Sequence, residues 1–371
     1  MVSLNPAKLE MKAAVLSRLN EPLAILSGIE CSAPGRGQVL VKLAYSGVCH
    51  SQLMEVRGRR GDDAFLPHLL GHEGSGQVIQ VGEGVSKVSP GDLVVLGWIK
   101  GSGLESGGVQ YCCDSLPQKI NAGGVTTFNE YALVSENRVV PLPEGVPLDI
   151  AVLFGCAVPT GAGIITNDMR PIAGSSLAVF GLGGIGMSAL MATMLFQCAK
   201  VIAVDVSPDK LALARSFGAS HTIDASSSDA VREILALTDG LGVDYAVEAS
   251  GQVKVIEQAF ESIRRGGGEC VFATHPGQGS AISIDPYELI CGKQIRGSWG
   301  GSSNPDRDIP VFARLYLEGK LPLEKLITKR YPLESINEAL DDLEHHRVGR
   351  PLIEIDTSIG SHNTSKGKLL I

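Results

Sequence analysis

No run of basic residues occurs in the sequence, and 40 acidic residues outnumber 32 Lys and Arg. The formal net charge of -8 argues against a polyanionic partner, because binding to nucleic acid requires clustered Lys and Arg that displace counterions. We therefore expect no nucleic-acid partner. Aromatic residues are also scarce, at 5% of the chain, whereas the 45 glycines exceed the average share. This balance is typical of an α/β protein with many tight turns between strands and helices.

Long uncharged stretches are rare, and residues 175–199 are the stretch that could be mistaken for a membrane span. Glycines crowd the first half of this stretch. A strand, a glycine turn and a buried helix explain it without lipid, because a sheet covered on both faces produces such apolar runs. We therefore expect no membrane partner.

Cysteines are few for a chain of this length, with eight among 371 residues. The first ten residues contain no apolar segment of the kind that a secretory signal needs, so we expect reduced thiols and a cytoplasmic location. The length exceeds the roughly 250 to 300 residues at which a single hydrophobic core stops growing, which predicts two domains.

Two patterns of hydrophobic residues divide the chain. The first half contains short segments with a period near two, separated by glycine and proline, which favours a compact, mostly antiparallel, barrel-like domain. Its predicted strands are Met11–Ser17, Val39–Ala44, Gly76–Val81, Asp92–Leu96 and Glu130–Val134. From about Thr160, apolar strands alternate with helical segments, which is typical of a doubly wound parallel sheet in an α/β fold.

The strands of this second pattern are Leu177–Phe180, Val201–Asp205, Thr222–Asp224, Tyr245–Ala249 and Glu269–Ala273, with helices at Asp209–Phe217 and Ser228–Leu237. After Trp299, two helices (Asp308–Glu318 and Leu333–His345) and a strand near Pro351–Ile355 indicate a return to the first domain. We therefore predict a first domain from residues 1–157 and 300–371, and a nucleotide-binding domain from residues 158–299.

A glycine-rich turn follows the first strand of the second pattern. Its sequence, Gly181-Leu-Gly183-Gly184-Ile-Gly186, leads directly into an apolar helix. Gly181 permits the tight turn, Gly183 lets the backbone approach a pyrophosphate, and Gly186 allows close packing of helix on strand. The free N–H groups of the helix N-terminus then face the phosphates. A glycine-rich turn without a ligand is the simpler alternative, but the strand before it and the helix after it favour a dinucleotide site.

Asp205 ends the next strand, 19 positions after Gly186. A carboxylate there can accept hydrogen bonds from both ribose hydroxyls and would repel a 2′-phosphate. The sequence therefore predicts NAD in preference to NADP.

Cys49, His72 and Cys156 are candidate ligands of a catalytic zinc. Two thiolates and an imidazole suit zinc, and three protein ligands leave a fourth position open for substrate. Singly, each has a simpler explanation, because cysteine is often just buried and a lone histidine is often a hydrogen-bonded core residue. The spacings of 23 and 84 positions leave both explanations open.

The segment Gly71-His-Glu-Gly-Ser-Gly76 resembles the signature of the zinc-containing alcohol dehydrogenases in the medium-chain dehydrogenase/reductase superfamily. The match extends over nearly the whole chain, through Gly47–Ser51, Pro90–Asp92, Gly155–Cys156 and the glycine-rich turn. The resemblance implies one catalytic zinc on Cys49, His72 and Cys156, a GroES-like β-rich domain, and a Rossmann domain between its two pieces.

Further site residues follow from this resemblance alone. Ser51 matches the hydroxyl that takes the substrate's proton, and Glu73 matches the carboxylate behind the metal, which can tune or briefly ligate it. Trp98 matches an aromatic of the substrate pocket, although ordinary core packing would also explain it. The residues that match cofactor-binding positions are His50 and Arg350 at the phosphates, Thr160 and Ile185 at the nicotinamide, and Lys210 at the adenosine ribose.

The sequence departs from the family pattern in three places. Many members bind a second zinc through four cysteines, but residues 100–113 offer only the adjacent pair Cys112 and Cys113, with Ser102, Glu105 and Gly108 in the other ligand positions. Two adjacent cysteines cannot make a tetrahedral site, so we expect the structural zinc to be absent. Gln52 replaces the usual aspartate behind His72, and Met54 replaces a histidine that relays the proton in some members.

The resemblance implies an oxidoreductase that transfers a hydride reversibly between a small alcohol and NAD, giving an aldehyde or ketone. Zinc would act as a Lewis acid that lets the alcohol form an alkoxide near neutral pH, and Ser51 would relay the proton. A zinc-free quinone or enoyl reductase of the same superfamily, and a non-catalytic nucleotide-binding protein, are the alternatives. Segment Gln294–Trp299 is expected to extend the sheet across a two-fold axis in a homodimer or homotetramer.

Overall fold

The computed structural model describes residues 9–360, which divide into two compact units. Of these residues, the first unit contains 9–156, Asn304–Ala313 and 323–360. The second unit contains Ala157–Ser303 and Arg314–Pro322.

Two sheets form the first unit. Strands β1, β2, β7, β8 and β4 close a barrel, and a seven-stranded sheet has the order β10-β6-β5-β3-β18-β17, with β9 also paired to β3. The strands are β1 Leu9–Leu16, β2 Ala24–Cys31, β3 Gln38–Gly47, β4 His68–Leu69, β5 Gly74–Val81, β6 Leu93–Leu96, β7 Val109–Cys113, β8 Ile120–Ala122, β9 Tyr131–Ser135, β10 Val139–Pro141, β17 Ile327–Pro332 and β18 Arg350–Glu354. The predicted mostly antiparallel, barrel-like architecture is confirmed.

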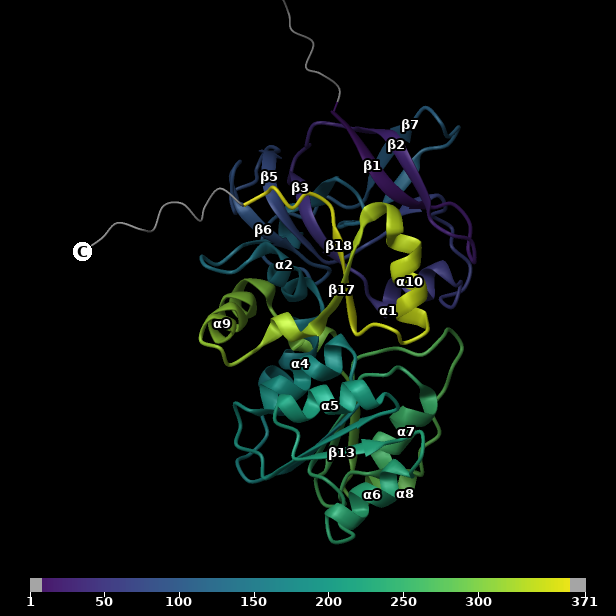
Figure 1. The fold of residues 1–371 in the computed structure, drawn as a ribbon, viewed down its shortest axis with the longest axis vertical. Helices are drawn as coiled ribbons and strands as arrows, with labels where there is room; N and C mark the ends of the chain where they lie inside the picture. Colours follow the sequence, from purple (N-terminus) through teal and green to yellow (C-terminus); the bar gives the residue numbers. More distant parts are fainter. Residues whose placement is uncertain (1–8, 361–371) are drawn as a thin grey trace, which may run out of the picture. The chain divides into compact units, whose positions relative to one another are not determined.

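The alternation of residues along β3 gives the seven-stranded sheet one buried face. Val39, Val41 and Leu43 of β3 point to one side and are fully buried in a cluster with residues of β5, β6 and β9. Helix α10 packs against β17 and β18 (Figure 1). The helical elements of this unit are α1 His50–Val56, η1 Glu136–Arg138, α2 Leu148–Ala151, η2 Val152–Gly155, η5 Leu323–Leu326, η6 Leu333–Ser335 and α10 Ile336–Glu344, and α9 Pro305–Leu317 is shared by both units.

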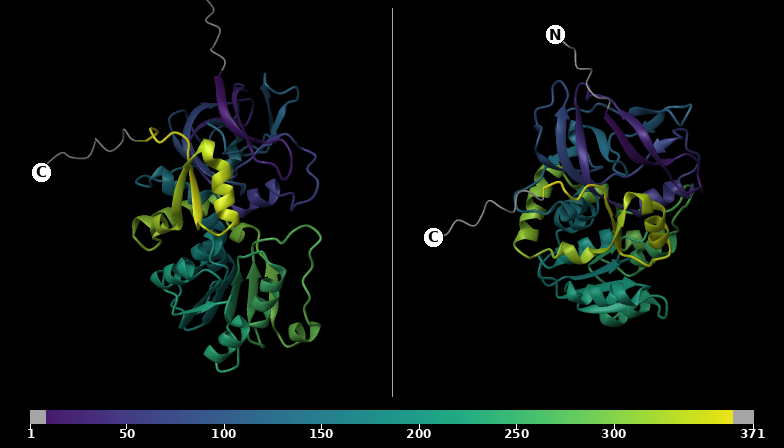
Figure 2. Two further views of the ribbon diagram at one scale, coloured as in Figure 1. Left: turned by 45° about the vertical axis from the view of Figure 1, so that its right-hand side comes forward. Right: turned by 45° about the horizontal axis from the view of Figure 1, so that its top comes forward.

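The second unit is built on a parallel sheet of six strands in the order β13-β12-β11-β14-β15-β16. These strands run side by side in the left view of Figure 2. They are β11 Ser176–Phe180, β12 Lys200–Asp205, β13 His221–Asp224, β14 Tyr245–Glu248, β15 Glu269–Phe272 and β16 Gln294–Gly297. The order reverses between β11 and β14, which is where α/β sheets of this kind bind dinucleotides. The predicted Rossmann sheet is confirmed.

The helical elements of this unit are α3 Ala157–Gly163, the π-helix η3 Ile164–Met169, α4 Gly184–Thr193, α5 Pro208–Ser216, α6 Ala230–Leu237, α7 Val253–Glu261, α8 Pro286–Ile290 and η4 Gly300–Ser302. The predicted helix from Ser228 begins two residues later because Asp229 is its N-cap and accepts from the N–H groups of Val231 and Arg232. The predicted helix Leu333–His345 is divided into η6 and α10.

The uncharged residues 175–199 form β11, the glycine turn and α4, as expected. Within residues 9–360, no single helix is both long and apolar enough to span a membrane. One bent pair of successive helices, Leu148–Gly155 and Ala157–Met169, passes that test of length and composition only when both are taken together.

Candidate metal and cofactor sites

Four side chains capable of binding metal meet in the first unit. Cys49, His72, Glu73 and Cys156 each offer one ligand atom, and the four atoms all lie within 4.8 Å of one another. Among the residues that the structure describes, no other group of three or more such side chains comes together. Two sulfurs, an imidazole nitrogen and a carboxylate oxygen suit zinc in tetrahedral geometry. The donor set therefore fits a zinc ion.

The backbone explains why these ligands converge. Cys49 is the N-cap of α1, just after the end of β3, while His72 and Glu73 directly precede β5. Because β3 and β5 are antiparallel neighbours, the end of one lies beside the start of the other. Cys156 follows η2, and a Cβ placed on Gly155 would lie 2.8 Å from Glu73 Cβ. The absence of a side chain at Gly155 thus lets Cys156 approach the other ligands.

The pKa of Cys49 depends on both Cys156 and His72, and the pKa of each of these two depends on Cys49. The pKa of Cys49 lies well below its usual range because Cys156 and His72 donate hydrogen bonds to it. The pKa of Cys156 is raised, since the Cys49 thiolate and burial both disfavour a second charge. Burial opposes protonation of His72, but the hydrogen bond and charge of Cys49, together with the charge of Glu73, raise its pKa. Metal binding would release these shared protons, as expected for a zinc ligand set.

Glu73 is fully buried and forms an ion pair with Arg350 through Oε1 and Nη2. Its other oxygen, Oε2, has no hydrogen-bond partner. An unpaired buried carboxylate oxygen is costly unless a ligand satisfies it, so Oε2 is available to a metal. Burial raises the pKa of Glu73, and the Arg350 charge opposes that shift. The sequence did not predict this pair, and contact of Arg350 with a cofactor phosphate stays a prediction.

Gln52 contacts two parts of the zinc site. Its amide nitrogen contacts His72 Nδ1, and its amide oxygen accepts a 2.9 Å hydrogen bond from the Cys49 N–H, closing a capping box on α1. His72 Nε2 lies 3.3 Å from the sulfur of Cys156, so Nε2 faces the metal position. A metal on Nε2 leaves the proton on Nδ1, which then needs an acceptor. The amide oxygen of Gln52, which stands where the family has a carboxylate, instead accepts from the Cys49 N–H.

Replacing Gln52 by glutamate should tighten zinc binding about tenfold, because two carboxylate oxygens can accept from the Cys49 N–H and from His72 at once. Competition with a chelator at fixed pH measures the affinity. Gln77→Glu on β5, which adds the same charge outside the ligand group, is the control. Equal zinc affinity in Gln52→Glu and the wild type would show that the amide already orients His72 fully.

The remaining predicted residues of the first unit lie on elements that adjoin the ligands. Ser51 is half-buried in the first turn of α1, with Oγ 3.4 Å from His72 Nδ1. His50 is exposed, and its ring stacks on that of His346 with centroids 6.4 Å apart. Trp98 is half-buried just after β6, and its carbonyl accepts a hydrogen bond from Arg138. The roles assigned to these residues stay predictions.

In the second unit, the glycine-rich turn has the geometry that its sequence predicts. Gly181 has a φ of 82°, which favours glycine, and a Cβ on Gly186 would lie 1.8 Å from the Gly181 oxygen. A Cβ on Gly183 would meet nothing within 4 Å, so the space over the turn is open. Gly184 begins α4, whose N-terminal N–H groups border this space. The turn therefore fits a pyrophosphate.

Asp205 fixes the turn from one side. Its Oδ2 accepts a 2.6 Å hydrogen bond from the Leu182 N–H, and its Oδ1 accepts one of 2.9 Å from Ser207. Lys210 lies half-buried in the first turns of α5, five positions further along the chain. The carboxylate thus stands beside the glycine turn, as an acceptor for a ribose would.

Thr160 and Ile185 belong to two helices in close contact. A Cβ on Gly161 would lie 2.0 Å from the carbonyl oxygen of Ile185, so α3 and the start of α4 touch through backbone atoms. The hydroxyl of Thr160 is buried, with no hydrogen-bond partner within the protein. A buried hydroxyl without a partner is usually satisfied by a ligand or by water, which fits the predicted contact with the nicotinamide.

Residues 100–113, where many family members bind a structural zinc, are held by carboxylates. Buried Glu136 accepts hydrogen bonds from the backbone N–H groups of Ser86, Lys87 and Leu104 at 2.7 to 2.9 Å. Glu105 forms an ion pair with Lys100, which with other polar contacts lowers the pKa of Glu105 to about 2.

Among the described residues, neither cysteine of this lobe belongs to a group of three or more potential metal ligands. Cys112 is exposed and Cys113 is buried, as expected for neighbours on β7. The polar network was not visible in the sequence, because its partners lie far apart along the chain.

Substituting Glu136 by glutamine should lower the free energy of unfolding by about 2 kcal/mol, since three backbone donors lose a charged acceptor. Glu83→Gln, at an exposed position, is the control, and urea unfolding monitored by fluorescence is the measurement.

Contacts with backbone donors lower the pKa of Glu136 despite burial. The contribution of Glu136 to the free energy of unfolding should therefore be fully present above the pKa of the unfolded chain, about 4.3. It should be lost as the pH falls through the lower pKa of Glu136 in the folded protein. Equal stabilities of the two variants would contradict this role.

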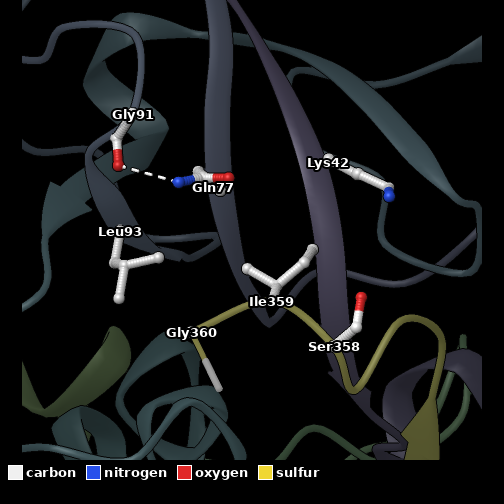
Figure 3. Close-up of a pocket in the computed structure, with 7 residues that line it drawn as sticks. All are labelled: Lys42, Gln77, Gly91, Leu93, Ser358, Ile359 and Gly360. Carbon is white, nitrogen blue, oxygen red and sulfur yellow. Dashed lines mark hydrogen bonds between the residues drawn. The ribbon is translucent and has the colours of Figure 1, made fainter. Parts of the chain in front are cut away.

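Figure 3 shows a pocket of about 490 Å³ elsewhere in the first unit. It is lined by Lys42, Gln77, Gly91, Leu93, Ser358, Ile359 and Gly360. Lys42 forms an ion pair of 2.5 Å with Asp356, and the Gln77 amide donates to the Gly91 carbonyl. None of the predicted site residues lines this pocket.

Comparisons with known proteins identify the family of this chain. The model of the alcohol dehydrogenase GroES-like domain matches residues 35–144, and that of the zinc-binding dehydrogenase domain matches residues 184–317. S-(hydroxymethyl)glutathione dehydrogenase of Haemophilus influenzae is 31% identical over 93% of this chain and 97% of its own length. The enzyme of the same name from Escherichia coli O1:K1 is also 31% identical, over 93% of this chain and all of its own length.

Solved structures show the same relationship. An alcohol dehydrogenase zinc-binding domain protein from Burkholderia ambifaria has a TM-score of 0.85 at 31% identity, covering 94% of this chain and 99% of its own. Benzyl alcohol dehydrogenase from Acinetobacter calcoaceticus has a TM-score of 0.83 at 29% identity, with the same coverage. The prediction of a zinc alcohol dehydrogenase with zinc and NAD as cofactors is confirmed at the level of the family. The chain belongs to the zinc-containing alcohol dehydrogenases of the medium-chain dehydrogenase/reductase superfamily.

Proposed function

We propose that this enzyme transfers a hydride reversibly between a small alcohol and NAD, with Ser51 relaying the proton of the alcohol. The observation that most strongly supports this proposal is the convergence of Cys49, His72 and Cys156, because three protein ligands leave a fourth zinc position for substrate, with the Glu73 carboxylate beside them. When bound there, zinc supplies the Lewis acidity that makes the alcohol hydroxyl more acidic.

Ser51 is suited to accept the proton of that hydroxyl. It lies in the first turn of α1, two positions after Cys49, and its Oγ approaches the ring of His72. It can accept a proton from the substrate while giving its own to solvent. Met54 cannot continue this path, since its thioether has no proton to exchange, so water or the exposed imidazole of His50 receives the proton next.

The second unit binds and orients NAD in this proposal. The open space at Gly183 and the start of α4 accept the pyrophosphate, and Asp205 accepts hydrogen bonds from the adenosine ribose. Thr160 offers its unpartnered hydroxyl to the nicotinamide half. A nicotinamide held in one position lowers the entropic cost of hydride transfer.

An apolar or aromatic alcohol is the substrate class that we favour. The half-buried indole of Trp98 supports it, and the related structure from Acinetobacter calcoaceticus bears the name of a benzyl alcohol dehydrogenase. The second candidate is S-(hydroxymethyl)glutathione, because relatives with 31% identity over 93% of this chain bear that name.

A panel of alcohols, followed by the absorbance of reduced nicotinamide, tests the proposal. It contains benzyl alcohol, ethanol, butane-2,3-diol and S-(hydroxymethyl)glutathione, each with NAD and with NADP. We expect the highest kcat/KM with benzyl alcohol and NAD, and a fall of about a hundredfold in kcat for Ser51→Ala, as for loss of an acid–base group. Highest activity with the glutathione adduct would favour the second candidate, and no activity of the zinc-loaded protein with any alcohol would overturn the proposal.

We also propose that two copies associate through β16, the edge strand of the six-stranded sheet. An exposed strand edge offers unpaired backbone groups to a second copy, and Tyr287 and Ile290 on the preceding helix α8 are exposed hydrophobic residues. Light scattering at micromolar concentration should give a mass of two or four chains. A mass of one chain would contradict this association.

A further inference from the structure

A buried carboxylate at the carboxyl end of β14 has no role in the proposed mechanism. Glu248 is the last residue of β14, and its exposed fraction is 0%. Strand β14 is the neighbour of β11 across the point where the strand order reverses. The half of the sheet that begins with β11 binds one mononucleotide of a dinucleotide, and the half that begins with β14 binds the other. Glu248 therefore lies at the border between the two halves.

The carboxylate organises the turn that follows β14. Its Oε1 accepts hydrogen bonds from the Ser250 N–H at 2.6 Å, the Ser250 hydroxyl at 2.5 Å and the Gly251 N–H at 3.0 Å. Its Oε2 lies 3.4 Å from the hydroxyl of Thr274, which follows β15. Burial raises the pKa of Glu248, and these donors oppose that shift. One side chain thus joins the ends of two strands to the turn between β14 and α7.

This turn lies against the glycine-rich turn. A Cβ placed on Gly181 would lie 2.8 Å from the Ser250 nitrogen and 3.0 Å from the carbonyl carbon of Ala249. The Ala249 N–H also donates a 2.8 Å hydrogen bond to the Phe180 carbonyl, directly before Gly181. On the opposite side, Asp205 accepts from Leu182. The glycine turn is therefore fixed between two carboxylates, one from each half of the sheet.

We propose that Glu248 is a positioning residue for the cofactor, which holds the turn at residues 249–251 against Gly181 and thereby fixes the pyrophosphate-binding backbone. The identity of the ligand in this inference, NAD, rests on the proposed function. The ordering of the glycine turn by Glu248 does not depend on it. Asp205 can fix only the side of the turn that faces the adenosine ribose. Glu248 fixes the side that continues into the nicotinamide half.

The test compares Glu248→Ala with a matched variant at the other end of the same strand. Asp244 directly precedes β14 and also accepts three hydrogen bonds, from the Ser176 N–H, the Ser176 hydroxyl and Arg264 Nε. Asp244→Ala therefore removes a similar set of contacts from β14 without touching the turn at 249–251. Calorimetry measures the Kd for NAD, and hydrogen exchange of the peptide covering residues 181–187 measures the order of the glycine turn.

We expect Glu248→Ala to raise the Kd for NAD about tenfold, or about 1.4 kcal/mol, and to accelerate exchange at residues 181–187, while Asp244→Ala changes neither. Glu248→Gln, which keeps an acceptor oxygen, should restore most of both. If the alanine variant does not fold, Ser250→Ala replaces it, because it removes one donor to Glu248 and should change both readouts in the same direction by less. Zinc content should stay unchanged throughout.

Equal effects of the Glu248 and Asp244 variants, or unchanged exchange at residues 181–187 in Glu248→Ala, would overturn the inference. If the wild-type protein binds no NAD, the proposed function fails, and the exchange data alone then decide whether Glu248 orders the turn.

Discussion

Replacing Cys156 by alanine should remove the zinc and lower kcat/KM by about a thousandfold or more, because a metal used as a Lewis acid supplies several kcal/mol. Cys156 is buried within 4.8 Å of the other ligand atoms, so no water can substitute for its sulfur without rearrangement of the site. The substitution also removes the thiol whose hydrogen bond lowers the pKa of Cys49. Metal analysis of the purified variant and the rate of NAD reduction with an alcohol are the two measurements.

Cys113→Ala is the matched control for this experiment. Cys113 is also a buried thiol of the first unit, but it packs in the hydrophobic cluster of the barrel and lies outside the ligand group. Its loss should leave zinc content and kcat/KM close to the wild-type values. Retention of full zinc and activity by Cys156→Ala would contradict the assignment of this residue as a ligand.

Replacing Asp205 by asparagine should lower the preference for NAD over NADP by tenfold to a hundredfold, since the repulsion between the carboxylate and a 2′-phosphate disappears. The amide oxygen can still accept from the Leu182 N–H, so the glycine turn should keep its shape. The ratio of kcat/KM values for the two cofactors is the measurement. Asp209→Asn, which removes an exposed charge at the start of α5, is the control.

An unchanged cofactor ratio in Asp205→Asn would mean that another group excludes the 2′-phosphate. An equal change in Asp209→Asn would point instead to the general negative charge of this surface. Only a change confined to Asp205 agrees with the proposed ribose contact.

Local patterns made the fold predictable from the sequence. The alternation of Val39, Val41 and Leu43 marks one buried face of β3, and the apolar segment that ends at Phe180 leads directly into the glycine turn. Both signals lie within a few neighbouring residues, where periodicity and turn chemistry are decisive. The zinc ligands are different, because 23 and 84 positions separate them and their spacing alone left simpler explanations open. The family resemblance, rather than spacing, identified them.

Polar partners far apart along the chain could not be predicted in this way. Arg350 follows Glu73 by 277 positions, and the ion pair became visible only once β18 was seen beside β3. The dual role of Gln52 depends on the direction of its amide within the first turn of α1. The carboxylates of Glu136 and Glu248 act on backbone N–H groups, which leave no signal in the residue types that donate.

The central claim is that one zinc per chain, on Cys49, His72 and Cys156, is required for oxidation of an alcohol by NAD. Its most direct test is a chelator titration in which zinc content and the rate of NAD reduction are measured on the same samples. We expect one zinc per chain at full activity, and activity that falls in proportion to that zinc and returns when zinc is added back. Two tightly bound zincs per chain, or full activity in zinc-free protein, would contradict the claim.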